Sequence, residues 1–369
     1  MFGLSPLPRT LAAALRDAGD KKLEVRVSAV RDLGRHAREG ADVAVERLRR
    51  VLSEDSAVAV RAEAAVALAD AGARAALPAL VEAAGRDDAP RVRQMALVAL
   101  GELGQADDED ATRVIERALR DEQPELRFQA LIAFAQLQGA GALDVLHRFV
   151  RDEDPHVRYV ALRLAEERWL ESGDVELPER LGNAARAALD DTDTSVKLAA
   201  ALVLGRAGDK SGASVIVDAV RSGQGAAEPE DAEAAIELAG ALGLDDARGG
   251  LARRAFGVFG VSRDPFAWQA RVALARLGDA RARQAILRGL GSWSRDARTL
   301  AVAAAGRARL AEARPLLEAM QGKPDRAEPS AVEEALGLLA PPEGVDARTD
   351  RGEDERHDSA PRQDPGPDP

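Results

Sequence analysis

One alanine recurs along this chain at a nearly fixed interval, and it constrains the fold more than any other feature. Starting from Arg26, equivalent positions follow 31 to 39 residues apart, and the residue three places further on is alanine in all nine cases. A period of this length is the signature of stacked supersecondary units rather than of one thick core. The nine alanines are Ala29, Ala64, Ala96, Ala130, Ala161, Ala200, Ala235, Ala270 and Ala301.

Each repeat contains two helical stretches. Within residues 92–104 the apolar side chains follow one another at spacings of 4, 1, 3 and 3, which places them on one face of a helix, and Gly104 is the expected stop signal. A second helical pattern lies between these stretches, as in residues 75–84 and 110–119. No strand pattern is present, so the sequence predicts an all-α array of helix pairs.

Acidic turns separate the pairs, as in residues 86–90 (Arg-Asp-Asp-Ala-Pro) and 120–124 (Arg-Asp-Glu-Gln-Pro). We expect Asp to cap the following helix and Pro to occupy its first turn. The first unit is predicted to begin near residues 5–6, with its first helix at residues 11–15. An insertion at residues 166–178 lengthens the fifth unit, and residues 222–231 are predicted to form a flexible joint.

Two parts of the chain differ in composition. Residues 1–340 carry the repeats and are predicted to form one solenoid. Residues 341–369 are rich in Pro and carry nine acidic against four basic groups, with almost nothing apolar. Such a segment cannot bury enough surface to offset its ordering entropy, so we predict a disordered acidic tail.

Charge and cysteine content exclude several classes of protein. The net charge is −12, and without the tail the chain still has 54 acidic against 47 basic residues, which argues against general nucleic-acid binding. There is no cysteine, and so no disulfide, thiolate metal site or cysteine nucleophile. No secretory signal and no run of about 18 apolar residues is present, so we expect a cytoplasmic protein without membrane insertion.

The pattern Asp…Val-Arg-x-x-Ala…Leu-Gly-x-Leu-Gly resembles HEAT repeats, in particular the HEAT-like repeats of phycobilin lyases, over roughly residues 8–340. The resemblance implies an all-α, right-handed α-solenoid of about nine to ten helix pairs whose second helices line the concave side. It also implies an arginine-to-aspartate ladder that holds successive turns in register, which we favour over phosphate binding by the same arginines. The ladder residues would be Arg26, Arg61, Arg93, Arg127, Arg158, Lys197 and Arg298.

Motifs for catalysis or cofactor binding are missing from the sequence. His147 and His156 stand nine residues apart across a turn, which is not a metal-ligand spacing, and the His-Glu pairs of iron-binding HEAT enzymes do not occur. Neither Gly-x-Ser-x-Gly nor a glycine-rich phosphate loop is present. We therefore expect no cofactor and no metal, and interpret the chain as a non-enzymatic scaffold or adaptor for one or more proteins. A bilin-lyase-like enzyme or enzyme subunit is the alternative.

The partner-binding surface is predicted from the helical wheel. Positions one, two, five and nine residues after each ladder residue point away from the core. In the central units many of them are apolar or aromatic, which fits an amphipathic helix or extended segment of a partner, with Phe128 and Tyr159 as anchors. Sideways packing between neighbouring second helices is the equally weighted alternative. The predicted residues are Met95, Val98, Phe128, Ile132, Tyr159, Val160, Arg163 and Leu202.

Aromatic residues gather late in the chain. Five of the eleven are Phe256, Phe259, Phe266, Trp268 and Trp293. We favour a bulkier local core that compensates for the missing ladder arginines at Ala232 and Ala267, and an exposed partner anchor is the second interpretation.

Overall fold

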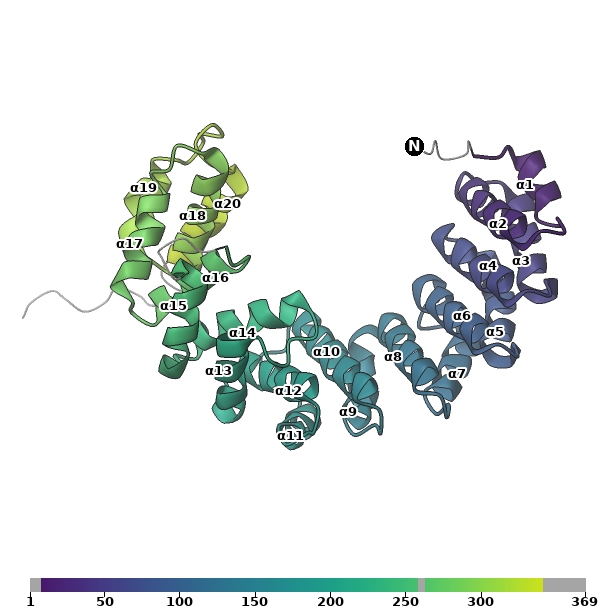
Figure 1. The fold of residues 1–369 in the computed structure, drawn as a ribbon, viewed down its shortest axis with the longest axis horizontal. Coiled ribbons are helices and arrows are strands. Elements are labelled where there is room, and N and C mark those ends of the chain that lie inside the picture. Colours follow the sequence, from purple (N-terminus) through teal and green to yellow (C-terminus); the bar gives the residue numbers. More distant parts are fainter. Residues whose placement is uncertain (1–7, 258–262, 341–369) are drawn as a thin grey trace, which may run out of the picture. The chain divides into compact units, whose positions relative to one another are not determined.

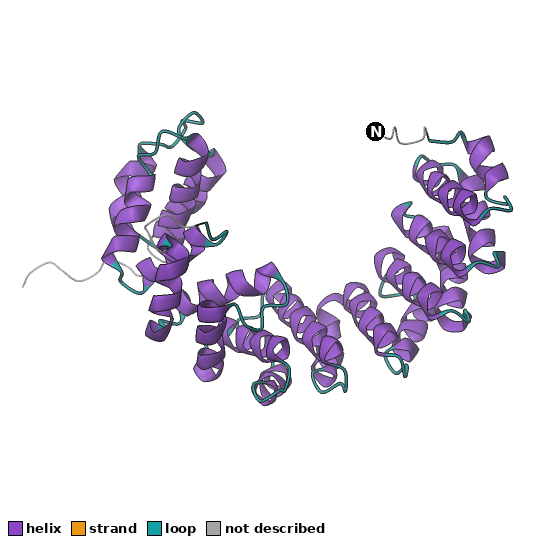
Figure 2. Ribbon diagram, in the orientation of Figure 1, coloured by secondary structure: helices purple, strands orange, loops and turns teal. Residues whose placement is uncertain are grey.

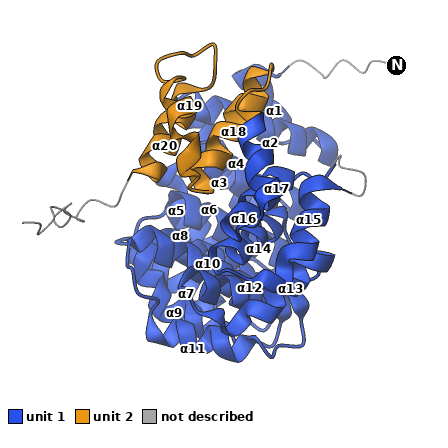
Figure 3. Cartoon of the chain, turned by 90° about the vertical axis from the view of Figure 1, so that its left-hand side faces the viewer, with its two compact units in different colours: residues 1–288 blue, residues 289–369 orange. Residues whose placement is uncertain are grey.

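The computed structural model describes residues 8–257 and 263–340, and the regular secondary structure in these ranges is helical throughout (Figure 2). The predicted tail at residues 341–369 and the predicted start of the first unit at residues 5–6 lie outside the described residues. The chain divides into two compact units, residues 1–288 and 289–369 (Figure 3). The repeat pattern marks no boundary at this position, and each unit is described by itself.

Unit 1 is built from alternating first and second helices (Figure 1). The first helices are α1 (Leu11–Asp17), α3 (Asp42–Glu54), α5 (Leu77–Arg86), α7 (Glu109–Ala118), α9 (Leu143–Phe149), α11 (Glu179–Ala188), α13 (Ala213–Ser222), α15 (Arg248–Phe256) and α17 (Ala280–Gly289). The second helices are α2 (Leu23–Arg38), α4 (Val58–Asp70), α6 (Pro90–Leu103), α8 (Pro124–Gln138), α10 (Pro155–Ser172), α12 (Thr194–Arg206), α14 (Pro229–Ala241) and α16 (Ala267–Arg276). Short 3-10 turns precede four first helices: η1 (Arg74–Ala76), η2 (Gly139–Ala142), η3 (Lys210–Gly212) and η4 (Asp245–Ala247).

Unit 2 contains the last described helices. They are α18 (Arg295–Arg307), the 3-10 turn η5 (Ala311–Ala313), α19 (Arg314–Glu318) and α20 (Pro329–Leu339). Helix α18 packs on α20.

The second helices of unit 1 form a row in which each helix packs on its own first helix and on the second helix of the next repeat. Unit 1 bends toward this row in Figure 1, so the second helices line its concave side. The predicted all-α solenoid of sequential helix pairs is confirmed.

Small residues let neighbouring second helices approach closely. All nine repeat alanines have a relative exposure of 0%. Five residues further on, several helices carry glycine, and a Cβ added at Gly101 or Gly240 would lie only 2.9 Å from Ala133 Cα or 2.6 Å from Ala273 Cα. Because those atoms are backbone, no side-chain rotation can make room. The period seen in the sequence is therefore the period of helix contact.

The arginine ladder joins the turns along one edge of the stack. Arg61 donates two hydrogen bonds of 2.8 Å to the Asp87 carboxylate of the next turn and one of 3.0 Å to the Asp55 carbonyl of its own turn. Asp87 in turn accepts the backbone N–H of Ala89 at 2.9 Å. Each carboxylate therefore fixes its own turn and holds the guanidinium of the preceding repeat.

The ladder is continuous from Arg26 to Arg158 and then changes. The successive carboxylate partners are Asp55, Asp87, Asp121, Asp152 and Asp191, at 2.7 to 3.1 Å, with Arg93 making a single bond where the others make two. Lys197 has no carboxylate within ion-pair distance in the described part of the chain. Arg298, in unit 2, donates to the carbonyls of Asp325 and Arg326. The predicted arginine-to-aspartate pairing does not hold at these two positions.

Helix capping also differs from the prediction in part. Asp154 and Asp193 are N-caps whose side chains accept backbone N–H groups, and Pro90, Pro124 and Pro155 begin their helices as expected. The N-caps of α4, α6 and α8 are instead Ala57, Ala89 and Gln123. In these turns the ladder aspartate, two residues earlier, bonds the N-cap N–H, so it orders the turn that precedes the helix.

The close approach at Gly240 predicts that Gly240→Ala destabilises the protein by about 1–3 kcal/mol, because the added methyl group overlaps the α16 backbone. Glycine-to-alanine changes in helices normally stabilise by roughly 0.5–1 kcal/mol. Gly249→Ala in α15 is the matched control, since nothing lies within 4 Å of its Cβ position. In urea unfolding, Gly240→Ala should be less stable than the parent protein and Gly249→Ala more stable. Equal stabilities of the two variants would contradict the close packing at Gly240.

The ladder predicts acid-sensitive stability. Burial raises the pKa of Asp87, but the hydrogen bonds from Arg61 and the Ala89 N–H outweigh this, so the pKa of Asp87 lies below its usual range. The stabilisation is therefore complete above the unfolded pKa of about 4 and is lost as pH falls through the lower folded pKa. Asp87→Asn should cost about 2 kcal/mol at pH 7 and progressively less below pH 4, measured by urea unfolding.

The neighbouring carboxylate is the control for this prediction. Asp88 lies 2.8 Å from the same Arg61 guanidinium, but its side chain is 91% exposed. Asp88→Asn should therefore change the unfolding free energy very little, because water screens exposed ion pairs. Equal effects of the two substitutions would mean that the buried geometry of the ladder contributes nothing.

Candidate partner-binding surface

A strip of apolar side chains runs across the middle of the row of second helices. Val66 on α4, Val98 on α6 and Ile132 on α8 occupy the same repeat position and are half-buried. The same position holds Arg31 on α2 and Arg163 on α10, so cations bracket the apolar residues. Met95 and Phe128 are also half-buried here, and we call Val66, Met95, Val98, Phe128 and Ile132 the central strip.

The central strip is partly committed to the core. Met95, Phe128 and Ile132 pack in part against buried residues while keeping some accessible surface. Half-buried Gln94 and Gln129 lie on the same two helices, α6 and α8. These side chains therefore contribute to the core and also leave apolar surface open to a second molecule.

Two residues predicted for this surface are buried. Val160 is 9% exposed and Leu202 is 0% exposed, so placing them on the surface was wrong. The backbone around Gly225 runs against α12: a Cβ there would lie 2.5 Å from the Thr194 carbonyl oxygen and 3.2 Å from Leu198 Cβ. The predicted flexible joint at residues 222–231 thus packs on α12, and helix periodicity did not reveal this.

Tyr159 and Arg163 belong to a buried polar network. The Tyr159 hydroxyl donates to Asp231 Oδ2 at 2.8 Å, and Arg163 Nε lies 3.3 Å from Asp231 Oδ1. Arg163 also pairs with Glu166, whose other oxygen lies 3.4 Å from Arg206 Nε. We call Tyr159, Arg163, Glu166, Arg206 and Asp231 the clasp, because it joins α10 and α12 to the start of α14.

Electrostatics favour a fixed protonation pattern in the clasp. Asp231 is 1% exposed and also accepts the backbone N–H groups of Ala227 and Glu228, which ties down the segment over α12. Burial and the hydrogen bond to Asp231 raise the pKa of Tyr159, so its hydroxyl stays a donor. Burial raises the pKa of Glu166, and Arg163 and Arg206 counteract it only in part. The clasp therefore pairs its own charges and leaves Tyr159 engaged.

Two residues in the sequence point to the clasp because they depart from the repeat pattern. Asp231 stands at a position that is Val or Leu in the first six repeats, and Glu166 at one that is small in the other eight. These exceptions lie 65 residues apart in sequence, and both carboxylates lie within ion-pair distance of Arg163. Acidic residues at two positions that are otherwise apolar or small, together with Arg163, could have indicated a buried ion pair.

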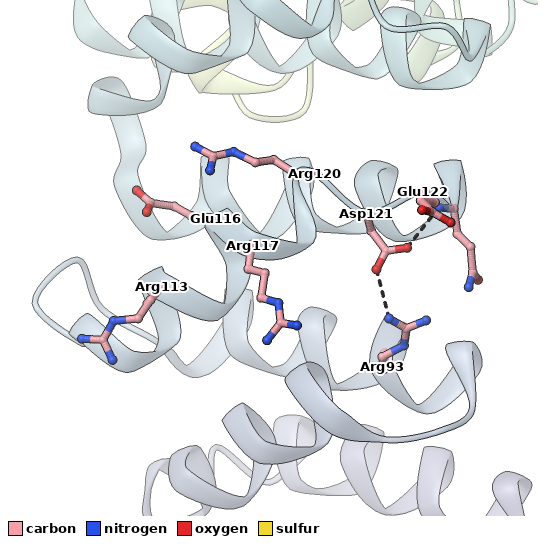
Figure 4. Close-up of a pocket in the computed structure, with 8 residues that line it drawn as sticks. Arg93, Arg113, Glu116, Arg117, Arg120, Asp121 and Glu122 are labelled. Carbon is pink, nitrogen blue, oxygen red and sulfur yellow. Dashed lines mark hydrogen bonds and ion pairs between the residues drawn. The ribbon is translucent and has the colours of Figure 1, made fainter.

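An open cleft of about 650 Å³ adjoins α7 (Figure 4). It is lined by arginines and acids in nearly equal number: Arg93, Arg113, Arg117, Arg120, Glu116, Asp121, Glu122, together with Gln123. Figure 4 shows Arg113, Arg117 and Arg120 pointing in different directions rather than toward one point. Arg93 is bonded to Asp121 at 3.0 Å, so the ladder and not a ligand occupies it.

The late aromatic residues differ in burial. Phe256 is buried, and Phe266 and Trp268 are half-buried, whereas Trp293 is 94% exposed and belongs to unit 2. Phe259 lies outside the described residues. The local-core interpretation therefore fits Phe256 and not Trp293.

Residues 8–257 and 263–340 bear on the possibility of a metal site or a membrane span. This part of the chain contains no group of three or more His, Asp or Glu residues that could hold a metal ion. His36 instead contacts the Arg9 carbonyl at 2.9 Å, and His147 the Leu143 carbonyl at 3.2 Å. None of the helices described here combines the length and apolar character needed to cross a bilayer.

The architecture defines the class: a helical-repeat solenoid stacked through its second helices. Residues 8–101 and 96–166 match the family model of HEAT repeats. Over residues 8–166 the chain therefore consists of HEAT repeats, and the same alternation of first and second helices continues to α17.

Similar folds occur among solved structures. The X-ray structure of YibA from Escherichia coli is similar with a TM-score of 0.53 and 18% sequence identity, covering 74% of this chain and 93% of that one, and so supports the fold alone. The complex of CpcE and CpcF of phycocyanin lyase from Nostoc sp. PCC7120 gives a TM-score of 0.40 and 20% identity, covering 75% and 97%, and is too distant to support an argument. No curated protein matches the chain.

The clasp predicts that Tyr159→Phe loosens the segment over α12. Removing the hydroxyl leaves buried Asp231 with one donor fewer, at a cost of about 1–3 kcal/mol. Trypsin should then cleave faster after Arg221, which begins this segment, while cleavage after exposed Arg113 stays unchanged. Uniformly faster cleavage would indicate general destabilisation instead.

Proposed function

We propose that this HEAT-repeat protein is a non-enzymatic scaffold that binds a partner protein through the central strip. HEAT-repeat solenoids generally offer their concave side to other proteins. The central strip supports the proposal: it is a run of half-buried apolar side chains on three successive second helices, with a charged residue at the equivalent position on either side. Apolar surface with a charged rim is characteristic of protein interfaces.

An amphipathic helix is the partner element that fits this surface. Packed helices lie roughly 8–10 Å apart, so three second helices present a strip roughly 20 Å long, which matches about four turns of helix. On the N-terminal side Arg31 is bonded to Glu63 at 2.7 and 3.1 Å, so the rim there is polar but paired. The apolar strip would provide affinity, and the rim would restrict orientation.

The structure also supports a non-catalytic role. The acidic groups of the clasp, Tyr159, Glu166 and Asp231, bond one another or arginines within it, and the segment before α14 ties Asp231 down. A catalytic acid or base needs a proton-transfer partner from the substrate within hydrogen-bond reach. The lyase-like alternative predicts a visible chromophore absorption in the purified protein, and the scaffold predicts none.

The proposal predicts that Val98→Thr together with Ile132→Thr weakens partner capture at least about ten-fold, since hydroxyl groups would replace a methyl group of Val98 and the ethyl arm of Ile132 at the centre of the interface. Tagged full-length protein would be purified from its native cell, and co-purifying proteins quantified by mass spectrometry. Tyr159 is left unchanged because the clasp requires it.

Val43→Thr with Val58→Thr is the matched control. These valines are 51% and 40% exposed and lie at α3 and at the start of α4, away from the strip. The helical circular dichroism of both double variants should equal that of the parent. Equal recovery of the same proteins by the strip variant and the parent would contradict the proposal.

A further inference from the structure

The end of unit 1 differs in charge from the rest of the molecule. Residues 248–288 contain nine arginines, two aspartates, no lysine and no glutamate, within a chain of net charge −12. They form α15, the described part of the connection to α16, α16 itself and most of α17. A strongly basic stretch in an acidic protein indicates a local partner of opposite charge.

Two of these arginines converge on aromatic rings. The Arg281 guanidinium lies 3.9 Å from the centre of the Phe256 ring, and the Arg271 guanidinium lies 5.8 Å from the same ring. Arg271 also lies 4.7 Å from the centre of the Trp268 ring. We call Phe256, Trp268, Arg271 and Arg281 the arginine–aromatic cluster.

Neither arginine has a carboxylate partner. Among residues 8–257 and 263–340, no acidic group lies within ion-pair distance of Arg271 or Arg281. The Nε atom of half-buried Arg271 is buried and has no acceptor. Asp264, which precedes Arg271 by seven residues in the sequence, is bonded to Arg254 at 3.0 Å. Two like charges therefore share one ring without a counterion, and cation–π contact offsets only part of that cost.

The ladder provides an internal comparison. The hydrogen bonds to Asp87 and Asp152 raise the pKa of Arg61 and Arg127, whereas burial, with no opposing charge, lowers the pKa of Arg271. The ladder thus pairs Arg61 and Arg127 with carboxylates, whereas Arg271 has no carboxylate partner among the described residues. An incoming carboxylate would relieve that imbalance at Arg271.

We propose that the arginine–aromatic cluster binds an acidic segment of a partner protein, with glutamate or aspartate carboxylates bonded to Arg271 and Arg281. The planar guanidinium forms paired hydrogen bonds with a carboxylate while its face stays stacked on a ring. The remaining arginines of residues 248–288 attract the same segment over a longer range.

A short acidic peptide fits better than a nucleic acid. A long polyanion would extend past this basic stretch onto a chain that is otherwise acidic, where repulsion opposes binding. A segment of a few acidic residues meets only the local positive charge, and Trp268 can contact its aliphatic carbons. The site is separate from the central strip, so failure of one proposal leaves the other intact.

The test uses the full-length protein and fluorescein-labelled decaglutamate, followed by fluorescence anisotropy at about 50 mM salt, where surface charges are weakly screened. We expect saturable binding that weakens as salt is raised. Arg271→Met with Arg281→Met should weaken it at least about ten-fold. The control Arg117→Met with Arg120→Met changes the net charge by the same amount at the cleft that adjoins α7. It should leave the affinity for decaglutamate within about two-fold of the parent value.

Several outcomes would overturn the proposal: absence of binding by the parent protein, equal loss in the two double variants, or tighter binding of a ten-residue oligothymidylate than of decaglutamate. If the first double variant melts well below the parent, Arg281→Glu replaces it, because Arg281 is exposed and its reversal does not disturb the core. That variant should lose binding while keeping its helical spectrum, and retained binding would count against the site.

Discussion

The carboxylate of each ladder aspartate performs two tasks, and the stack depends on both. It accepts a backbone N–H of its own turn, which orders the chain before the next helix, and it holds the guanidinium of the preceding repeat. The distance between successive turns is thereby fixed along one edge. Only at a fixed distance can the repeat alanines and glycines of neighbouring helices meet backbone to backbone, as at Gly240 and Ala273. The hydrogen bonds of the ladder and the close packing of the alanines and glycines therefore stabilise one another.

The clasp lies where the ladder ends. Lys197 takes the arginine position on α12, and the connection that follows carries no aspartate in the ladder register. The segment before α14 runs across α12 instead, and Asp231 reaches Tyr159 on α10, two second helices away. This arrangement explains why Leu198 is fully buried although it occupies an outward position of its helix. It also explains why the central strip stops at α8. On the next two second helices, the clasp engages α10 and the segment before α14 covers part of α12.

Sequence periodicity predicted the features that repeat and not those that occur once. The nine buried alanines, the helix pairs and the ladder from Arg26 to Arg158 follow from residues that recur at each period. Val160 and Leu202 were misplaced because a helical wheel describes one helix and does not show what packs against its outward positions. The clasp was missed for the same reason, although Asp231 and Glu166 stood out as polar exceptions. The arginine–aromatic cluster was obscured by averaging charge over the whole chain.

The role of each arginine in this protein depends on the residues around it and not on how many arginines the chain contains. Where a turn supplies an aspartate, as for Arg61, the guanidinium is structural and its hydrogen bonds are used within the stack. Where arginines of one helix diverge, as at α7, mixed acids neutralise them locally. In the part of the chain that the structure describes, Arg271 and Arg281 are brought together over aromatic rings with no carboxylate in reach. An unpaired cation is costly to hold in a partly buried site, so the surface that retains one is the surface whose partner must be acidic.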